Sequence, residues 1–328
     1  MSKGTILSGM RPTGRLHIGH LSVLENWVKL QEEYNCFYQV ADLHALTTSF
    51  EETETIKNNV RGMLVDWLAA GLDPEKSTIF VQSEVPQHSE LHLMLSMITP
   101  LSWLERVPTY KDQVQQLGKQ GKDINTYGFL GYPMLMAADI MVYRANAVPV
   151  GEDQLPHLEL CREVVRRFNH LYQRQVFPEP QALLAKIKML PGVDGRKMSK
   201  SYLNVINVAA EPDEIKNQVN AMITDPNRVR KTDPGNPDVC IVDKYHGIYV
   251  EAEHQGIREQ CQKGEIGCVQ CKKRLAQALD EHQTPLRERR NEVLKRPGYL
   301  DEILHEGAKK ARAAAQQTMD EVRAAIGI

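Results

Sequence analysis

The sequence predicts an α/β protein: a doubly wound parallel sheet of Rossmann type, followed by a smaller helical domain. Three observations lead to this expectation. Short β-rich runs alternate with amphipathic helical repeats through the first half of the chain. The 328 residues exceed the length of one average domain. After about residue 205 the apolar spacing becomes helical throughout. We therefore expect two domains, over residues 1–205 and 206–328.

The strands and helices of the first half follow one another in regular order. Ile6 and Leu7 belong to a first strand, and Leu21, Leu24 and Val28 then mark one face of a helix. The remaining expected elements are a strand over 36–41, a helix from Ile56 to Trp67, a strand over 78–82, a strand over 148–151 and a helix from Pro156 to Phe168.

The second half reads as helices interrupted by one loop. Helical spacing covers 211–219 and resumes from Arg274 onward, while the Pro-, Gly- and Asp-rich stretch 225–238 predicts a loop. The last helix carries an apolar stripe, which we expect to pack in the core. Its members are Ala308, Ala311, Ala315, Met319, Val322 and Ile326.

Composition excludes several classes of protein. Forty basic and forty-two acidic side chains give a net charge of −2, so the chain as a whole is not attracted to nucleic acid or anionic lipid. The longest apolar stretch, 128–143, is too short to span a membrane and contains Asp139. No signal peptide is recognisable, so we expect a cytoplasmic protein without membrane contact. In that compartment six cysteines favour thiols or metal ligands over disulfides.

The first chemical motif follows the first strand directly. Residues 8–14 read Ser-Gly-Met-Arg-Pro-Thr-Gly, and His17-Ile18-Gly19-His20 opens the first helix. Glycines let the backbone approach a phosphate, and a helix N-terminus supplies N–H groups and a positive dipole. His17 and His20 are three residues apart, so both imidazoles can face one side of the first turn and hydrogen-bond a phosphoryl group. The alternative is a turn with two surface histidines.

The second motif is the stretch 194–201, which reads Asp-Gly-Arg-Lys-Met-Ser-Lys-Ser. Two lysines and two hydroxyls in a short loop can bind a polyphosphate and neutralise the charge of a leaving group. A solvated basic loop is the alternative. The pairing of this loop with the histidine motif, 180 residues earlier from Lys197 to His17, favours a nucleotide site in two pieces.

These two motifs resemble the HIGH and KMSKS signatures of the class I aminoacyl-tRNA synthetases. The resemblance implies activation of an amino acid with ATP and Mg²⁺, followed by transfer to tRNA. It implies catalytic roles for His17, His20, Lys197 and Lys200. The ATP contacts that it implies are Met10, Arg11, Pro12, Thr13, Gly19, His20, Gly151, Glu152, Asp153, Leu190, Lys197, Met198, Ser199, Lys200 and Ser201. Many bacterial members carry Gln where this chain has Arg11.

Three further segments are similar to the tryptophanyl-tRNA synthetases within that class. They are Tyr132 to Ile140, Val148 to Gln154, and Ala41 to Ala45. The resemblance implies L-tryptophan and tRNA(Trp) as substrates, a homodimer, and a helical anticodon-binding domain over 206–328. It implies a tryptophan pocket made of Leu7, His44, Tyr132, Met136, Asp139, Ile140, Val148, Val150 and Gln154.

The residue types suit an indole substrate. A flat ring with one N–H donor needs apolar walls and one acceptor at the ring edge. Met136 and Asp139 are three residues apart on one helical face, and a substrate N–H would give the buried carboxylate a partner. Pairing of Asp139 inside the core is the alternative. The competing functions are those of a tyrosyl-tRNA synthetase and of a non-catalytic iron–sulfur RNA-binding relative.

Four of the cysteines lie within 32 residues, with the spacing C-x20-C-x6-C-x2-C. They are Cys240, Cys261, Cys268 and Cys271, in the segment 240–271. Four thiolates can hold either zinc or a [4Fe–4S] cluster, and spacing alone does not decide between them. A subset of the resembled family carries a similar motif with a [4Fe–4S] cluster, so we expect that cluster first and zinc second. Lys272, Lys273 and Arg274 follow directly and are candidate tRNA contacts, with a solvated helix start as the alternative.

Overall fold

A computed structural model describes residues 2–107, 110, 124–184, 190–199 and 202–328. In that part of the chain five parallel strands form one sheet in the order β3-β2-β1-β4-β5. They are β1 (Thr5–Met10), β2 (Asn35–Val40), β3 (Ser77–Val81), β4 (Ala147–Val150) and β5 (Gln181–Leu184). The predicted fold class is confirmed, although β5 had no signal in the sequence. The strand order reverses between β1 and β4, which opens a crevice at their carboxyl ends.

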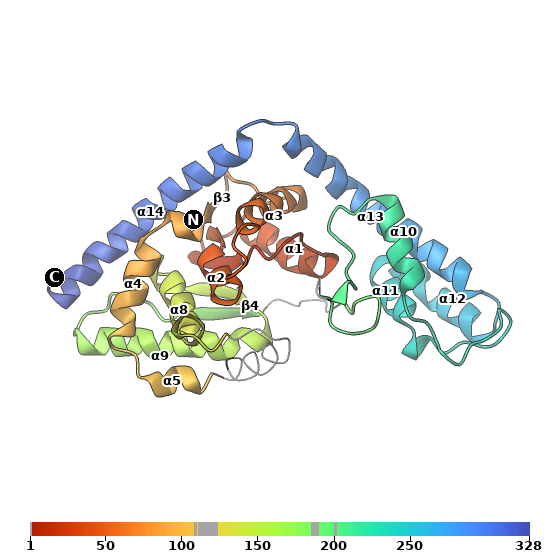
Figure 1. The fold of residues 1–328 in the computed structure, drawn as a ribbon, viewed down its shortest axis with the longest axis horizontal. Helices are drawn as coiled ribbons and strands as arrows, with labels where there is room; N and C mark the ends of the chain where they lie inside the picture. Colours follow the sequence, from red (N-terminus) through yellow and green to blue (C-terminus); the bar gives the residue numbers. More distant parts are fainter. Residues whose placement is uncertain (1, 108–109, 111–123, 185–189, 200–201) are drawn as a thin grey trace.

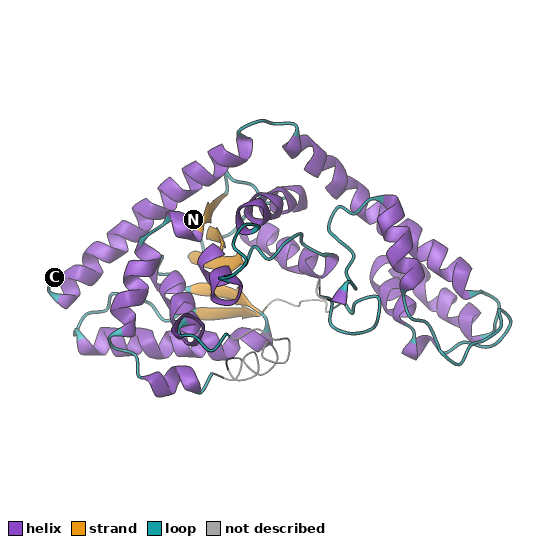
Figure 2. Ribbon diagram, in the orientation of Figure 1, coloured by secondary structure: helices purple, strands orange, loops and turns teal. Residues whose placement is uncertain are grey.

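Helices cover both faces of the sheet (Figure 2). Successive strand residues point to opposite faces, so Ile6 packs into one core with Leu24 and Leu64, while Leu7 packs into a second core with Ile140. The helices of this part are α1 (Leu21–Leu30), α2 (Asp42–Ser49), α3 (Ile56–Ala70), α4 (Gln87–Ser96), α5 (Leu101–Glu105), α7 (Tyr127–Leu130), α8 (Tyr132–Val142) and α9 (Leu155–Leu171).

The carboxyl-terminal part is helical, as predicted. Its helices are α10 (Pro212–Ala221), α11 (Ile241–Tyr249), α12 (Glu251–Gln262), α13 (Cys268–Leu294) and α14 (Tyr299–Ile326). The stretch 225–238 is largely loop, but α11 and α12 were not predicted and α13 begins at Cys268 rather than near Arg274. None of the described helices combines the length and the apolar composition needed to cross a membrane.

The last two helices diverge from each other. Figure 1 shows α13 and α14 as two long arms that meet at an apex, with α10 to α12 against α13 and the sheet beneath α14. The predicted stripe from Ala308 to Val322 is buried, and it packs in the core that contains Leu7 and Phe80. α14 therefore covers the edge strand β3 and lies with the parallel sheet, although the sequence placed it within a helical unit over 206–328.

Gly307 makes the contact between α14 and β3 possible. A Cβ built at this position would lie 1.7 Å from the carbonyl oxygen of Ile79 on β3. Only a residue without a side chain lets the helix backbone approach the strand so closely. The edge of the sheet is thereby shielded from other chains.

The Gly307→Ala variant is expected to lose about 1–3 kcal/mol or more of unfolding free energy, because strand and helix must separate to admit the methyl group. Urea denaturation measures this loss. Gly256→Ala is the matched control, since Gly256 lies within α12 with open space around the added Cβ. The unfolding free energy of that control is expected to rise by about 0.5–1 kcal/mol, because Ala has a higher helix propensity than Gly. An equal change of unfolding free energy in the two variants would contradict the close contact of α14 with β3 at Gly307.

Candidate active site

A cavity of about 450 Å³ opens at the carboxyl ends of β1 and β4, where the strand order reverses. All nine residues predicted for tryptophan line it, although they come from β1, α2, α8, β4 and the turn η3 (Glu152–Gln154). The apolar lining includes Leu7, Met136, Ile140, Val148 and Val150. These side chains form walls that suit a flat hydrophobic ring.

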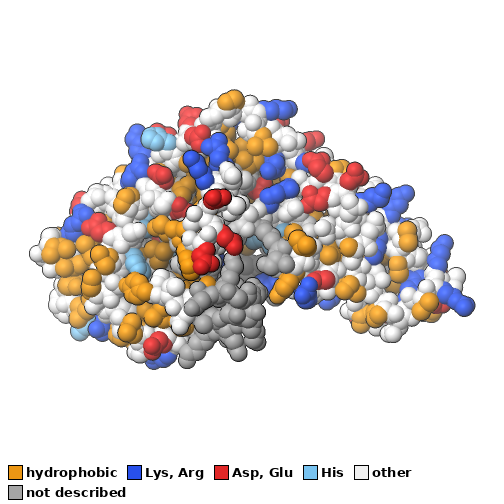
Figure 3. Space-filling view, in the orientation of Figure 1, with side chains coloured by type: hydrophobic (Ala, Val, Ile, Leu, Met, Phe, Trp, Pro, Cys, Tyr) orange, Lys and Arg blue, Asp and Glu red, His pale blue; other side chains and the backbone are white. Residues whose placement is uncertain are grey.

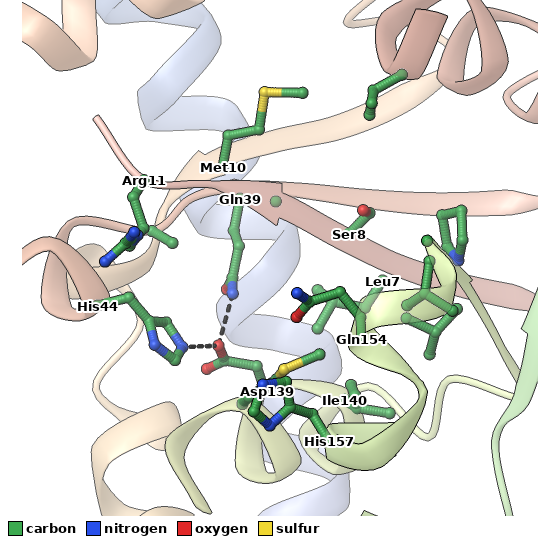
Figure 4. A pocket seen from close by; sticks show the side chains of 18 of the residues that line it. Leu7, Ser8, Met10, Arg11, Gln39, His44, Asp139, Ile140, Gln154 and His157 are labelled. Atoms are coloured by element: carbon green, nitrogen blue, oxygen red, sulfur yellow. Dashed lines mark hydrogen bonds and ion pairs between the residues drawn. The ribbon is translucent and has the colours of Figure 1, made fainter. Parts of the chain in front are cut away.

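Asp139 lies in the wall of this cavity and accepts several hydrogen bonds (Figure 4). Oδ1 accepts from Gln82 Nε2 at 2.8 Å and lies 2.6 Å from His88 Nδ1. Oδ2 accepts from Gln39 Nε2 at 2.6 Å and lies 2.9 Å from His44 Nε2. Pairing within the protein, one of the two roles considered for Asp139, is therefore confirmed. Direct contact with a substrate N–H stays a prediction.

These partners keep the buried carboxylate ionised. Burial on its own raises the pKa of Asp139, but His88 and His44 outweigh it and hold the pKa well below its ordinary value. His88 in turn places Nε2 2.8 Å from Tyr143 Oη. The result is a fixed polar network beneath one end of the apolar cavity.

A second group of polar side chains in the cavity lining is formed by Tyr132, His157 and Gln154. Tyr132 Oη lies 3.1 Å from His157 Nε2, and the two rings meet edge to face. Burial lowers the pKa of His157, so its imidazole is neutral near pH 7. Gln154 donates through Nε2 to Asp153 at 2.9 Å. Neutral acceptors and one carboxylate in this region suit a substrate ammonium group.

The two predicted nucleotide motifs lie close together, since a Cβ built at Gly19 would lie 3.8 Å from Met198 Sδ. His17 pairs with Asn207 in an isolated bridge, and Ile18 N–H donates to Ile206 O at 2.9 Å. The segment that follows the lysine loop thus runs beside the turn η1 (Ile18–His20). Gly19 permits this compact turn, because a Cβ there would lie 2.9 Å from His17 Nδ1. His20 lines the cavity, whereas His17 does not.

Asn204 organises the lysine loop and was missed by sequence reasoning. It is 1% exposed, and its Nδ2 donates to Asp194 Oδ1 at 2.7 Å and to the Lys197 carbonyl at 3.2 Å. Its Oδ1 accepts from Ser199 N–H at 2.8 Å. Met198 is buried in the core beside this loop, while Lys197 is exposed. The loop is therefore anchored at its middle, and its described cations Arg196 and Lys197 are both exposed.

The predicted ATP residues divide into two groups. Those lining the cavity are Met10, Arg11, His20, Gly151 and Asp153. Those outside its lining are Pro12, Thr13, Gly19, Glu152, Leu190, Lys197, Met198 and Ser199. Lys200 and Ser201 fall outside the residues that the structure describes. The cavity therefore brings together only part of the predicted ATP site.

Arg11 presents a cation to this cavity. Its side chain is exposed to the open space, and no carboxylate in the described chain lies within ion-pair distance. The surrounding protein lowers the pKa of Arg11 by desolvation. An unpaired guanidinium in a pocket wall favours an anionic ligand.

Sequence reasoning also missed the donors around Asp139. Gln39, Gln82 and His88 are all buried, and Gln39 lines the cavity. Gln39 could have been noticed as a lone amide inside a buried strand run, and Gln82 as the polar end of the next one. His88 lies on α4 and has no comparable signal in the sequence.

The four clustered cysteines come from the ends of three helices. Cys240 precedes α11, Cys261 lies near the end of α12, and Cys268 and Cys271 begin α13. Every pair among the four thiols is close enough to interact electrostatically. Burial, followed by the other three cysteines, raises the pKa of Cys271 to about 12.

Arg228 lies against the same cysteines. Its Nη1 is 3.6 Å from Cys261 Sγ and 4.0 Å from Cys268 Sγ. Among the described residues no group of three or more His, Cys, Asp or Glu is arranged to hold a metal ion. The predicted metal site thus has its thiols gathered in one region but lacks the compact geometry of a single-ion site.

The three predicted tRNA-binding cations are not equivalent. Lys272 Nζ donates to the carbonyls of Asn220 and Met222, at 2.7 and 2.8 Å, at the carboxyl end of α10. This contact satisfies helix-terminal carbonyls and ties α13 to α10. Lys273 and Arg274 are exposed. Lys272 therefore has a structural partner already, while its two neighbours face solvent.

Comparisons with known proteins show the family to which the chain belongs. The family model described as "tRNA synthetases class I (W and Y)" matches residues 2–283. The chain is 53% identical over 327 residues to a tryptophan–tRNA ligase of Thermotoga maritima, covering 98% of this chain and 99% of that one.

Two solved structures are also similar to this one. A Campylobacter jejuni tryptophanyl-tRNA synthetase complexed with ADP and tryptophan superposes with a TM-score of 0.88 at 34% identity, covering 99% of this chain and 100% of that chain. An Archaeoglobus fulgidus tyrosyl-tRNA synthetase complexed with L-tyrosine gives a TM-score of 0.64 at 20% identity, covering 88% and 90% of the two chains. The second likeness concerns the fold alone.

Proposed function

Because the chain belongs to the class I tRNA synthetases of the tryptophan and tyrosine family and is a tryptophan–tRNA ligase, we propose that the cavity between β1 and β4 holds tryptophan beside ATP. One observation carries this assignment: all nine residues expected to bind tryptophan, together with His20 of the nucleotide motif, line a single cavity. The apolar walls take the indole ring. The polar end with Tyr132 and Gln154 takes the α-amino group.

The reaction in this cavity has two steps. A carboxylate oxygen of tryptophan attacks the α-phosphorus of ATP, the bond to the bridging oxygen breaks, and pyrophosphate leaves. A hydroxyl of the terminal ribose of tRNA(Trp) then attacks the carbonyl carbon of tryptophanyl-adenylate, and AMP leaves. Positioning and charge neutralisation do most of the work in the first step.

The nucleotide motifs supply that neutralisation. His20, with His17 packed against it at a ring separation of 3.9 Å, is assigned to the α-phosphate and ribose. Lys197 and Lys200 are assigned to the pyrophosphate, together with Mg²⁺. Arg11 is assigned to a phosphate, because it presents an unpaired cation to the cavity among the described residues. Closure of the lysine loop on ATP would then bring the exposed Lys197 to the site.

Binding of substrate fragments tests this arrangement. Indole-3-propionate, which lacks the α-amino group, is expected to bind roughly 10- to 100-fold more weakly than tryptophan in calorimetric titrations. In a Gln154→Ala variant that difference is expected to shrink, because an acceptor for the ammonium group is gone. An unchanged difference in the variant would contradict the assignment of Gln154.

We further propose that the segment 240–271 holds a [4Fe–4S] cluster. The donor set supports it, since four thiols gather in one region and interact pairwise. The spacing C-x20-C-x6-C-x2-C is similar to that of a family subset that carries such a cluster, which favours it over zinc here. Gly264 adopts φ +73°, and a Cβ there would lie 2.3 Å from Thr232 O, so the chain turns tightly between the ligands. The cluster's role in this account is structural.

Anaerobic purification with iron, sulfide and zinc analysis tests the cluster. About four irons and four sulfides per chain are expected, with broad visible absorption that disappears in Cys268→Ser. Cys161→Ser is the control, because Cys161 is buried on α9 away from the motif, and it is expected to keep the absorption. One zinc without iron would show that the site is a zinc knot instead.

The helical part is proposed to bind the tRNA anticodon through Lys273 and Arg274. Alanine at both positions is expected to lower kcat/KM for tRNA charging by roughly tenfold, since hydrogen bonds to phosphate charges are lost, with tryptophan activation unaltered. Lys272→Ala serves as a comparison that should reduce stability instead. Equal loss of charging and activation in the double variant would contradict an RNA contact.

The chain is also proposed to act as a cytoplasmic homodimer. Large apolar side chains are exposed on α4, α5 and α7 and directly after α4, namely Leu93, Leu101, Tyr127 and Met97 at 56%, 62%, 69% and 73%. Figure 3 shows hydrophobic side chains gathered over the region of α4. Such patches mark protein interfaces. Sedimentation equilibrium is expected to give twice the chain mass, and a monomer at micromolar concentration would contradict this proposal.

A further inference from the structure

A buried tyrosine of the helical part contacts the segment that leads into the lysine loop (194–201). Tyr245 lies on α11 and is 0% exposed, and its Oη donates to the carbonyl oxygen of Pro191 at 2.6 Å. Burial raises the pKa of Tyr245, so the hydroxyl keeps its proton and acts as a donor. The ring itself packs in the hydrophobic core, so the hydroxyl is held in a fixed place.

Pro191 is joined across a small hairpin to Lys197, which is assigned to the pyrophosphate. Pro191 and Lys197 face each other in an isolated antiparallel bridge, and Gly192 N–H donates to the Arg196 carbonyl at 2.7 Å. Proline has no backbone N–H, so its carbonyl oxygen is the one main-chain group through which Pro191 can be held by hydrogen bonding. The hydrogen bond from Tyr245 therefore fixes the backbone against which Lys197 is paired.

The first residue of α11 supports the same loop from a second direction. Ile241 N–H donates to the Ile223 carbonyl at 3.2 Å, and Ile223 N–H donates to the Val193 carbonyl at 3.0 Å, directly before the loop. Gly195 adopts φ +81°, and a Cβ there would lie 3.1 Å from Ile241 Cδ1. The turn at Gly195 therefore lies directly against the start of α11.

The position of the Lys197 backbone matters because its side chain is long and flexible. The side chain is exposed, while its neighbour Met198 is buried in the core that also contains Tyr245. A lysine loses rotamer freedom when it binds a phosphate, so the place of its backbone decides how readily the ammonium group reaches that phosphate. Misplacement of a catalytic group by about 1 Å can lower a rate by about 10²-fold.

We propose that Tyr245 is a positioning residue for adenylate formation, which holds Lys197 at the pyrophosphate through Pro191. This inference rests on the proposed function, which assigns Lys197 to the pyrophosphate. It gives α11 a role in the ATP step, although this helix belongs to the part of the chain proposed to bind the anticodon. Because α11 begins directly after Cys240, the segment 240–271 includes the helix that supports the lysine loop.

Tyr245→Phe removes one hydroxyl and keeps the ring in the core. In ATP–pyrophosphate exchange, kcat/KM for ATP is expected to fall roughly 10- to 100-fold, because the Pro191 carbonyl loses this donor and the hairpin loosens. The Kd for tryptophan, measured by calorimetric titration, is expected to be unaltered. Single-turnover transfer of tryptophan from preformed tryptophanyl-adenylate to tRNA(Trp) is also expected to be unaltered, because pyrophosphate has already left.

Tyr249→Phe is the matched control. Tyr249 lies one turn further along α11, and its ring stacks on that of Tyr245 with centroids 6.2 Å apart. Burial raises the pKa of both hydroxyls, but Tyr245 is the one that donates to Pro191. The control is expected to keep the wild-type kcat/KM for ATP. Wild-type exchange in Tyr245→Phe, or an equal loss in both variants, would overturn the proposal. So would an equal loss of exchange and transfer in Tyr245→Phe, since that would indicate general damage to the fold.

Amide hydrogen exchange measured by mass spectrometry tests the anchoring without any activity assay. The N–H groups of Gly192 and Val193 are bonded at the base of the loop, to Arg196 O and Asn204 O. Peptides containing them are expected to exchange roughly tenfold faster in Tyr245→Phe, while peptides from β1 and β2 exchange as in the wild type. Unaltered exchange at the base of the loop would refute the anchoring. Absence of tryptophan-dependent ATP–pyrophosphate exchange in the wild type would instead count against the proposed function, so the two failures are distinguishable.

Discussion

The Asp139→Asn variant is expected to lose tryptophan-dependent ATP–pyrophosphate exchange by roughly 10²-fold or more in kcat/KM and to lose about 3–5 kcal/mol of unfolding free energy. The carboxylate is the common acceptor for Gln39, Gln82, His44 and His88. An amide cannot accept from all of them, so buried donors are left without partners and the cavity wall loses its fixed shape. Urea denaturation and exchange kinetics measure the two losses.

The control for this variant is Glu159→Gln. Glu159 pairs with Arg162 and Arg166 on the surface of α9, where an ion pair contributes about 0–1 kcal/mol. It is expected to leave exchange unaltered. An Asp139→Asn protein as stable and as active as this control would show that the network is incidental.

The pH dependence of stability follows from the same residue. The pKa of the Asp139 carboxyl is held below its ordinary value, so the ionised group stabilises the fold at pH values above about 4. That contribution is lost as the pH falls from about 5 through the lowered pKa. The wild type is therefore expected to lose more unfolding free energy than Asp139→Asn between pH 5 and the acid limit of measurement. Parallel plots of unfolding free energy against pH for the two proteins would contradict a lowered pKa of Asp139.

His20→Ala is expected to reduce kcat for adenylate formation by roughly 10²–10³, with the Kd for tryptophan nearly unaltered. His20 lines the cavity, and contacts of its Nδ1 with the backbone of His17 at 3.2 Å fix the ring before ATP arrives. A donor positioned in advance stabilises the charge that develops on the α-phosphate without reorganisation. Single-turnover kinetics with calorimetry separates this loss from a binding defect.

His17→Ala is the informative comparison. His17 is not part of the cavity lining but packs on His20, so its loss is expected to act through the position of His20 and to be smaller. His170→Ala, on the exposed end of α9, is expected to behave as the wild type. A His20→Ala enzyme that binds tryptophan poorly but turns over normally would place His20 in the amino-acid site rather than the phosphate site.

Local periodicity was sufficient to predict most of the sheet. The strand runs 36–41 and 78–82 appear as β2 and β3, shifted by about one residue, because apolar β-rich runs bounded by turns read as buried parallel strands. The four-residue β5 is too short for a periodic signal, and α12 is largely polar, so both were missed. α11 was missed although Ile241, Tyr245 and Ile248 stand at helical spacing. The path of α14 back to β3 depends on Gly307 meeting Ile79, a contact between residues far apart in the chain.

The residues expected to bind tryptophan could be predicted to lie together, but the hydrogen-bond network around Asp139 could not. All nine expected residues line the cavity, and their contact with tryptophan stays a prediction. The donors that hold Asp139 lie 51, 57 and 100 residues away at His88, Gln82 and Gln39. Patterns among neighbouring positions in the sequence do not show that such distant residues contact one another. Lys272 shows the same limit, since its partners on α10 lie 50 and 52 residues earlier.

The measurement that tests the central claim most directly is ATP–pyrophosphate exchange by the wild-type protein with tryptophan and, separately, with tyrosine. Tryptophan is expected to support exchange. Tyrosine is expected to support it less by about 10⁴-fold, because its phenol hydroxyl does not lie where the indole N–H of tryptophan meets an acceptor. Comparable exchange with tyrosine, or none with tryptophan, would contradict the assignment of this cavity to tryptophan activation.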